Sequence, residues 1–177
     1  MKIKIGFSTT NSIWSKIIRR LTKANVSHTY IKFYDSTLGT DLVLHADYSG
    51  VQFELAEKFD IGNFTVEEYE IDDTRLDKAV KNNLWHLGKK YNYYKMFNFI
   101  FFIMFKRWFV RKMKNPIVDA GKIICVDFIF YILNDAEITN LPIGYIAPKL
   151  FSKWCQENYE QFGWKRKIYD DAPQWLK

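Results

Sequence analysis

Cysteine and histidine are scarce in this chain of 177 residues, which holds two cysteines and three histidines. Two cysteines are too few for the disulfide framework that stabilises small secreted domains. Neither a Cys-x-x-Cys pair nor a His-Glu-x-x-His motif is present, which excludes the common zinc motifs. Any cysteine or histidine chemistry must therefore come from Cys125, Cys155, His28, His45 and His86.

Long apolar runs are also missing. The most apolar stretch, Phe99–Phe105, is seven residues long and ends at Lys106, whereas a membrane-spanning helix needs about 20 apolar residues. The N-terminal segment alternates charged and apolar residues and lacks the apolar centre of a secretory signal. We therefore expect no transmembrane helix and no signal peptide. The expected location is the cytoplasm, either peripheral to a membrane or carried in a virion.

Acidic residues are absent from 78–118, a stretch that carries ten of the 26 basic residues. Ten aromatic residues also fall within 91–109. One interpretation is a core helix with a solvated basic end. Another is a segment that lies on an anionic membrane or binds a lipid or acyl substrate. Nucleic-acid binding is the least favoured, because the rings that stack on bases stand in polar surroundings and this block is mostly apolar.

Hydrophobic periodicity predicts an α+β fold, with helices packed on an antiparallel sheet of about four to six strands. The length favours one domain over residues 1–177. We expect a first strand over 2–7 and then a meander of strands over 29–35, 42–46, 51–56 and 64–71. Helices are expected over about 12–24, 72–90, 123–134 and 148–159, the first of them docked on the sheet, before a basic and aromatic tail over 164–177.

Three residues form a candidate catalytic set. Cys125 begins a predicted helix, where unpaired backbone N–H groups and the helix dipole favour a thiolate. His28 and His45 fall on neighbouring predicted strands and can supply a base and the group that orients it. Each residue also has a simpler explanation, as a structural histidine or a core cysteine. A zinc site made of the same three residues lacks supporting spacing, so we expect no metal and no cofactor.

Several short segments, taken in order, resemble the circularly permuted NlpC-like cysteine hydrolases with a papain-like fold. In that group, and in the related lecithin:retinol acyltransferase-like enzymes, the histidine precedes the cysteine, as it does here. Asn92, Val126 and Asp127 depart from the group's usual residues, and His45 stands where many relatives carry an acid. The matching segments are the Trp-containing helix from Ser12, Val26-Ser27-His28-Thr29-Tyr30-Ile31, Leu44-His45-Ala46, Gly88-Lys89-Lys90-Tyr91-Asn92-Tyr93 and Ile124-Cys125-Val126-Asp127-Phe128.

The resemblance implies a thiol hydrolase that acts on amide or ester bonds, as a peptidase, an amidase, an ester hydrolase or an acyltransferase. Cys125 would attack the carbonyl, His28 would transfer the proton and His45 would fix the tautomer of His28. The Cys125 N–H and Tyr91 would hold the oxyanion. The implied substrates are cell-wall peptides or lipid-type acyl groups, and the implied partners are an anionic cell wall or membrane surface.

The aromatic block at about 95–115 resembles an insertion relative to compact members of the group. We expect it to form a membrane-facing or substrate-facing wall beside the site. The residues expected in this wall are Phe101, Phe102, Phe105, Lys106, Arg107 and Trp108. The alternative function is a non-catalytic binding or structural module, associated with a virion or envelope, that retains the papain-like fold.

Overall fold

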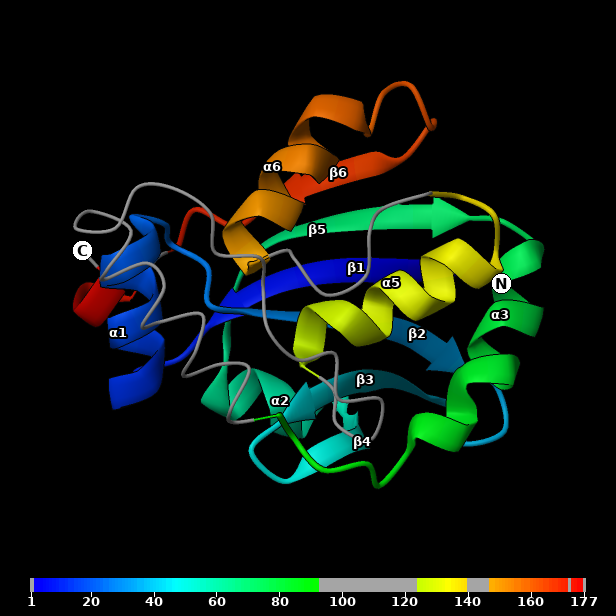
Figure 1. Cartoon of the computed structure of the whole chain (residues 1–177), viewed down its shortest axis with the longest axis horizontal. Coiled ribbons are helices and arrows are strands. Elements are labelled where there is room, and N and C mark those ends of the chain that lie inside the picture. Colours follow the sequence, from blue (N-terminus) through cyan, green and yellow to red (C-terminus); the bar gives the residue numbers. More distant parts are fainter. Residues whose placement is uncertain (1, 93–123, 140–146, 172, 177) are drawn as a thin grey trace, which may run out of the picture.

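The computed structural model describes residues 2–92, 124–139, 147–171 and 173–176. Its strands are β1 (Lys2–Thr9), β2 (His28–Asp35), β3 (Thr40–Asp47), β4 (Gly50–Leu55), β5 (Phe64–Asp72) and β6 (Lys165–Ile168). Its helices are α1 (Ile13–Thr22), α2 (Ala56–Gly62), α3 (Arg75–Asn83), α5 (Cys125–Asp135) and α6 (Pro148–Asn158), with short 3-10 helices η1 (Leu84–His86) and η2 (Gln174–Leu176). The predicted α+β class is confirmed (Figure 1).

The six strands form one antiparallel sheet in the order β4-β3-β2-β1-β5-β6. The first strand of the chain is thus central, and its side chains at Ile3, Ile5 and Phe7 are completely buried. The predicted meander holds for β2, β3 and β4. The predicted meander is wrong for β5. Helix α2 separates β4 from β5, and β5 pairs with β1, on the edge of β1 that faces away from β2.

Alternate residues of the central strands face two different layers, as the pleat of a strand requires. One face carries Ile5, Ile31 and Leu44 and belongs to the main core with α3, α5 and α6. Helix α5 lies on this face of the sheet (Figure 1), against β2 and β3, and eight of its eleven residues are buried. The opposite face carries Tyr30 and Val43, which form a smaller cluster with α2. A residue's position along β2 therefore decides which layer it meets.

Four expectations about the elements need correction. The helix predicted over 72–90 ends at Asn83 and continues only as a 3-10 turn. Helix α2 and strand β6 are additional elements. Helix α1 does not dock an apolar face on the sheet, because Ser15 is its one fully buried residue and Ile13 is 73% exposed. It lies at the flank of the sheet instead (Figure 1).

His86 is buried in the core without a hydrogen-bond partner for either ring nitrogen. Its ring stacks on Tyr131, with the centroids 4.8 Å apart, and meets the edge of Phe128. Burial, followed by the charge of Lys89, lowers the pKa of His86 to about 4. The imidazole is thus neutral in the folded state at neutral pH, and two polar atoms are desolvated without compensation.

We expect His86→Phe to raise the free energy of unfolding by about 1 kcal/mol at pH 7, because it removes two unsatisfied buried atoms and keeps an aromatic ring. The gain should be larger at pH 5. The unfolded histidine binds a proton below its ordinary pKa of about 6.5, whereas the folded one does not until about pH 4, so wild-type stability falls as the pH drops through this window. Urea denaturation at both pH values measures the difference. A variant less stable than the parent at pH 5 would contradict this account.

Candidate functional site

Two of the three predicted catalytic residues meet on the α2 face of the sheet. His28 is the first residue of β2, and His45 pairs with Tyr30 near the end of β3. The Nε2 atom of His28 lies 3.2 Å from Nδ1 of His45, and the two rings are edge to face. The Phe59 ring of α2 packs against both imidazoles. The contact predicted between the two histidine strands is therefore present.

A carboxylate that the sequence reasoning missed lies behind this pair. Glu54 Oε2 is 3.5 Å from His45 Nε2, and a carboxylate only accepts hydrogen bonds. The Gln52 amide nitrogen lies 3.5 Å from the same atom and donates to Asp47. With its proton on Nε2 facing Glu54, His45 accepts at Nδ1 from the Nε2–H of His28. We therefore assign the Nδ1 atom of His28 as its unprotonated, basic nitrogen.

Both imidazoles are uncharged at neutral pH. Burial, followed by the proximity of His45, lowers the pKa of His28 to about 3. Burial also lowers the pKa of His45, although the carboxylates of Asp47 and Glu54 act in the opposite direction. A neutral His28 can accept a proton, but its lowered pKa makes it a weak base in this resting structure, and a general base works best with a pKa near the working pH.

Cys125 lies at the N-terminal end of α5, which covers β2 near the start of that strand (Figure 1). The main chain and the side chain of Thr29, the second residue of β2, both lower the pKa of the Cys125 thiol. Thr29 follows His28 directly, so the sulfur lies beside the main chain next to the candidate base. Because successive strand residues face opposite layers, the imidazole and the thiol flank the beginning of β2 from its two faces. Within the described residues no hydrogen bond joins Cys125 to either imidazole.

Burial raises the pKa of the Cys125 thiol above its ordinary value, and the Cys125 residue is only 5% exposed. The Thr29 main chain and hydroxyl, and the Val126 N–H, lower the pKa, but burial is the larger effect. Asp127 raises it further. The predicted thiolate is therefore wrong for this resting structure: the helix N-terminus favours the anion, but desolvation favours the neutral thiol. Proton transfer must accompany any attack by the sulfur.

A cavity of about 520 Å³ opens beside the histidine pair. It is lined by His28 and His45 on the sheet, by Trp14 of α1 and by Tyr91. Tyr91 thus borders the same space as the candidate base, whereas Cys125 is not among the described residues that line this cavity. The predicted wall over about 95–115, with Phe101, Phe102, Phe105, Lys106, Arg107 and Trp108, lies outside the described residues.

Buried hydroxyl groups hold α1 at the edge of this cavity. Ser15 Oγ lies 2.9 Å from Thr9 Oγ1 and 2.6 Å from Ser27 Oγ. The Thr10 N–H also donates to Ser15 at 3.2 Å. Ser15 is the buried residue of α1, so these hydrogen bonds, rather than the packing of an apolar helix face, position the helix.

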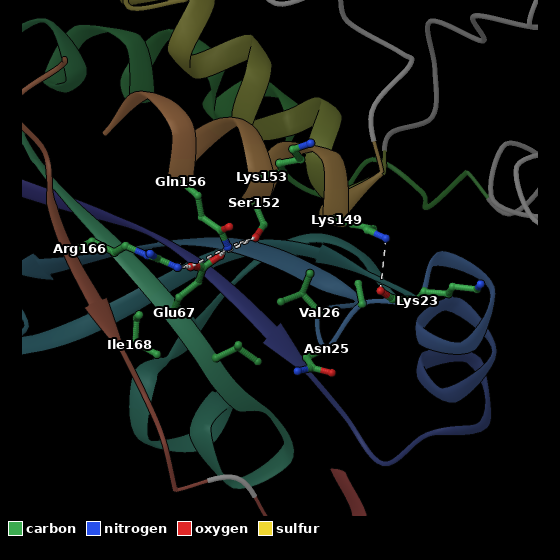
Figure 2. A pocket seen from close by; sticks show the side chains of 12 residues that line it. Lys23, Asn25, Val26, Glu67, Lys149, Ser152, Lys153, Gln156, Arg166 and Ile168 are labelled. Carbon is green, nitrogen blue, oxygen red and sulfur yellow. Dashed lines mark hydrogen bonds and ion pairs between the residues drawn. The ribbon is translucent and has the colours of Figure 1, made fainter. Parts of the chain in front are cut away.

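A second cavity, of about 320 Å³, lies between α6, β6 and the end of α1 (Figure 2). On its inner side the Glu67 carboxylate accepts from Arg166 at 2.9 Å, from Tyr69 at 2.9 Å, from Gln156 and from Ser152. These donors satisfy the carboxylate, so it is a junction between β5, β6 and α6. The cavity shares none of the three predicted catalytic residues.

Three observations bear on the wider predictions. The described part of the chain contains no group of three or more His, Cys, Asp and Glu side chains placed to hold a metal ion. None of the helices described here combines the length and the apolar character needed to cross a membrane. No protein-family model matches the chain, and no curated protein is found to be similar to it.

Proposed function

We propose that this protein is a cysteine hydrolase or acyltransferase that acts on an amide or ester bond. The observation that carries the proposal is the 3.2 Å contact between His28 Nε2 and His45 Nδ1 at the wall of a 520 Å³ cavity. This contact leaves His28 Nδ1 as the basic nitrogen. The thiol of Cys125 lies beside the next residue of the strand, at the N-terminus of a helix. The base and its orienting group thus lie on the α2 face of the sheet at the start of β2, and the proposed nucleophile lies near the same end of the strand on the α5 face.

The proposed reaction begins with a neutral thiol. As the sulfur of Cys125 bonds to the substrate carbonyl carbon, its proton passes around the start of β2, by way of water, to Nδ1 of His28, and the carbonyl oxygen becomes an oxyanion. The Cys125 N–H and Tyr91 are the proposed donors to that oxygen. When the oxyanion collapses, the amine or alcohol leaves with the proton from His28. The oxygen of water or of an acceptor alcohol, or the nitrogen of an amine, then bonds to the acyl carbon and gives its proton to His28. The carbon–sulfur bond breaks, and the proton returns from His28 to the sulfur, which restores the neutral thiol.

The described lining of the cavity contains two acids, Asp47 and Glu54, and no lysine or arginine. An anionic group is therefore disfavoured next to the reacting carbonyl. We propose that an anionic cell wall or membrane surface contacts the basic stretch over 78–118, while a neutral part of the substrate enters the cavity. Within that stretch, Lys89 is placed 3.3 Å from the centroid of the exposed Trp85 ring.

Acyl transfer to the protein tests this proposal directly. An activated short-chain acyl thioester, incubated with the intact protein at pH 7, should place its acyl group on the Cys125 peptide and not on the Cys155 peptide. His28→Ala should slow this labelling by about 100-fold or more, because a general base contributes at least that factor. Peptide mapping by mass spectrometry measures both. A Cys125 that reacts no faster than a free thiol would support the non-catalytic binding module instead.

A further inference from the structure

The cavity of about 320 Å³ between α6, β6 and the end of α1 has a basic lining (Figure 2). Its described lining holds one acid, Glu67, and four basic residues. Arg166 is paired with Glu67, so three basic residues remain without a matching acid in the lining. A hollow lined by charges of one sign favours an occupant of the opposite sign. The three residues are Lys23, Lys149 and Lys153.

Helix α6 turns one polar face toward this cavity. Two lysines on that face, Lys149 and Lys153, are one turn apart, and like charges at this spacing repel each other. Among the described residues Lys149 forms no ion pair, and Lys153 has only the exposed Glu157, at 3.6 Å. An anion bound beside the two ammonium groups would offset the repulsion. The cavity-lining residues of this face follow the i, i+3, i+4, i+7 spacing: Lys149, Ser152, Lys153 and Gln156.

The ammonium group of Lys149 is fixed at the end of α1. It donates to the main-chain oxygens of Thr22 at 2.6 Å and of Lys23 at 3.2 Å (Figure 2). An ammonium group has three N–H donors, and among the described residues the third has no acceptor. Because the side chain is already ordered, a ligand that accepts from the third donor loses less binding energy to side-chain ordering. The charge of Lys149 is thus positioned in advance at the wall of the cavity.

Lys23 has a backbone conformation that lysine rarely adopts. It is the C-cap of α1, with φ 53° and ψ 51°, in the left-handed region where glycine is the usual residue. A side chain with a Cβ atom is strained in this region. What lysine supplies here, and glycine would lack, is a positive charge at the cavity wall. The strained residue therefore points to a role for that charge.

We propose that this cavity binds a phosphate monoester, with the ammonium groups of Lys23, Lys149 and Lys153 around the phosphate. Lysine binds phosphate as a point charge, and a phosphate monoester carries about two negative charges at neutral pH, against one for a carboxylate. The monoester is either soluble or the headgroup of a lipid. This site shares no described lining residue with the histidine cavity and does not depend on the proposed catalysis. The apolar lining that contacts the organic part of the ligand is Ala24, Val26, Val66 and Ile168.

Lys23→Gly separates a ligand-binding charge from a structural residue. Glycine relieves the left-handed backbone, so without ligand the Tm should match or exceed that of the parent. The full chain is titrated with glycerol phosphate at constant ionic strength and followed by its amide NMR signals. The parent should show saturable shifts over 22–26 and 149–153. Lys23→Gly should weaken the affinity about tenfold, because a hydrogen bond to a charged group is lost.

Lys165→Gln is the matched control for net charge. Lys165 precedes Arg166 on β6, and the pleat of the strand turns it away from the cavity that Arg166 lines. Its loss should leave the affinity close to the parent value. The site is overturned if the parent shows no saturable shifts, or if Lys165→Gln loses as much affinity as Lys23→Gly. If Lys23→Gly lowers the Tm or does not fold, Lys153→Gln decides, with the same tenfold loss required.

Vesicles identify the source of the phosphate. Phosphatidic acid presents a phosphate monoester on a lipid, whereas phosphatidylserine does not. For a lipid ligand, the parent should sediment with phosphatidylcholine vesicles that contain phosphatidic acid more than with phosphatidylserine vesicles of matched surface charge, and Lys23→Gly should remove the difference. For a soluble ligand, parent and Lys23→Gly should sediment equally with both. Cys125→Ala should bind glycerol phosphate as the parent does, so failure of the hydrolase leaves this site standing.

Discussion

Cys125→Ala is expected to lower the hydrolysis of a short-chain p-nitrophenyl ester by about 1,000-fold or more, to the level of the uncatalysed reaction in the same cavity. The expectation follows from the proposed covalent step, which cannot begin without the sulfur. His28→Ala should cause a loss of similar size. Initial rates at pH 7, with far-ultraviolet circular dichroism as the check on folding, measure the effect.

The double variant Cys125→Ala/His28→Ala should be no slower than Cys125→Ala alone, because residues that act in one step do not contribute additively. Cys155→Ala is the matched cysteine control. Cys155 is completely buried on α6, and burial, followed by the charge of Glu67, raises its thiol pKa well above the ordinary value. Replacing it should leave the rate unchanged. A Cys125→Ala protein that turns over the ester as fast as the parent rules out the proposed function.

Most of the sheet could be predicted because apolar, core-facing residues alternate with other residues along its strands. Ile3, Ile5 and Phe7 point to the core and the residues between them do not, and the same pattern locates β2, β3 and β4. Strand β6 gave no such signal, since all four of its residues are exposed. Helix α2 has seven residues and no side-chain cap, so the turn residues at its end, Asp60–Gly62, suggested a loop.

The candidate site was predictable only where residue type and order are informative. His28, His45 and Cys125 carry chemistry that few other residues in the chain can supply. Glu54 is one of many acidic residues in the chain, so neither its type nor its place in the sequence singles it out. It lies near His45 because the register places Gln52 opposite that histidine and Glu54 two residues further on, a diagonal contact set by β3 and β4. The charge state of Cys125 was mispredicted because its burial depends on the docking of α5.

The Glu67 junction below α6 sets the other large expectation (Figure 2). Glu67 is 2% exposed, and Arg166 of β6 donates to its Oε2 through Nε at 3.2 Å and Nη2 at 2.9 Å. Arg166→Met should lower the free energy of unfolding by about 1.5–3 kcal/mol, because the buried Glu67 carboxylate loses its charged donor but keeps those from Tyr69, Ser152 and Gln156. Arg75→Met is the matched control. Arg75 holds Asp73 in an exposed pair of similar geometry, so its loss should change stability little.

A second substitution separates the buried charge from the lost packing of the arginine. Glu67→Gln in the Arg166→Met protein removes the unpaired charge while keeping a side chain that Ser152 and Tyr69 can contact. Stability should therefore recover most of the loss. Urea denaturation of the parent, Arg166→Met, Glu67→Gln and the double variant measures the coupling energy between the two residues. If the double variant is as unstable as Arg166→Met alone, packing of the arginine stem against its neighbours, rather than the ion pair with Glu67, holds β6 to the sheet. The recovered stability thus decides whether the ion pair with Glu67 or the packing of the Arg166 stem holds β6 to the sheet.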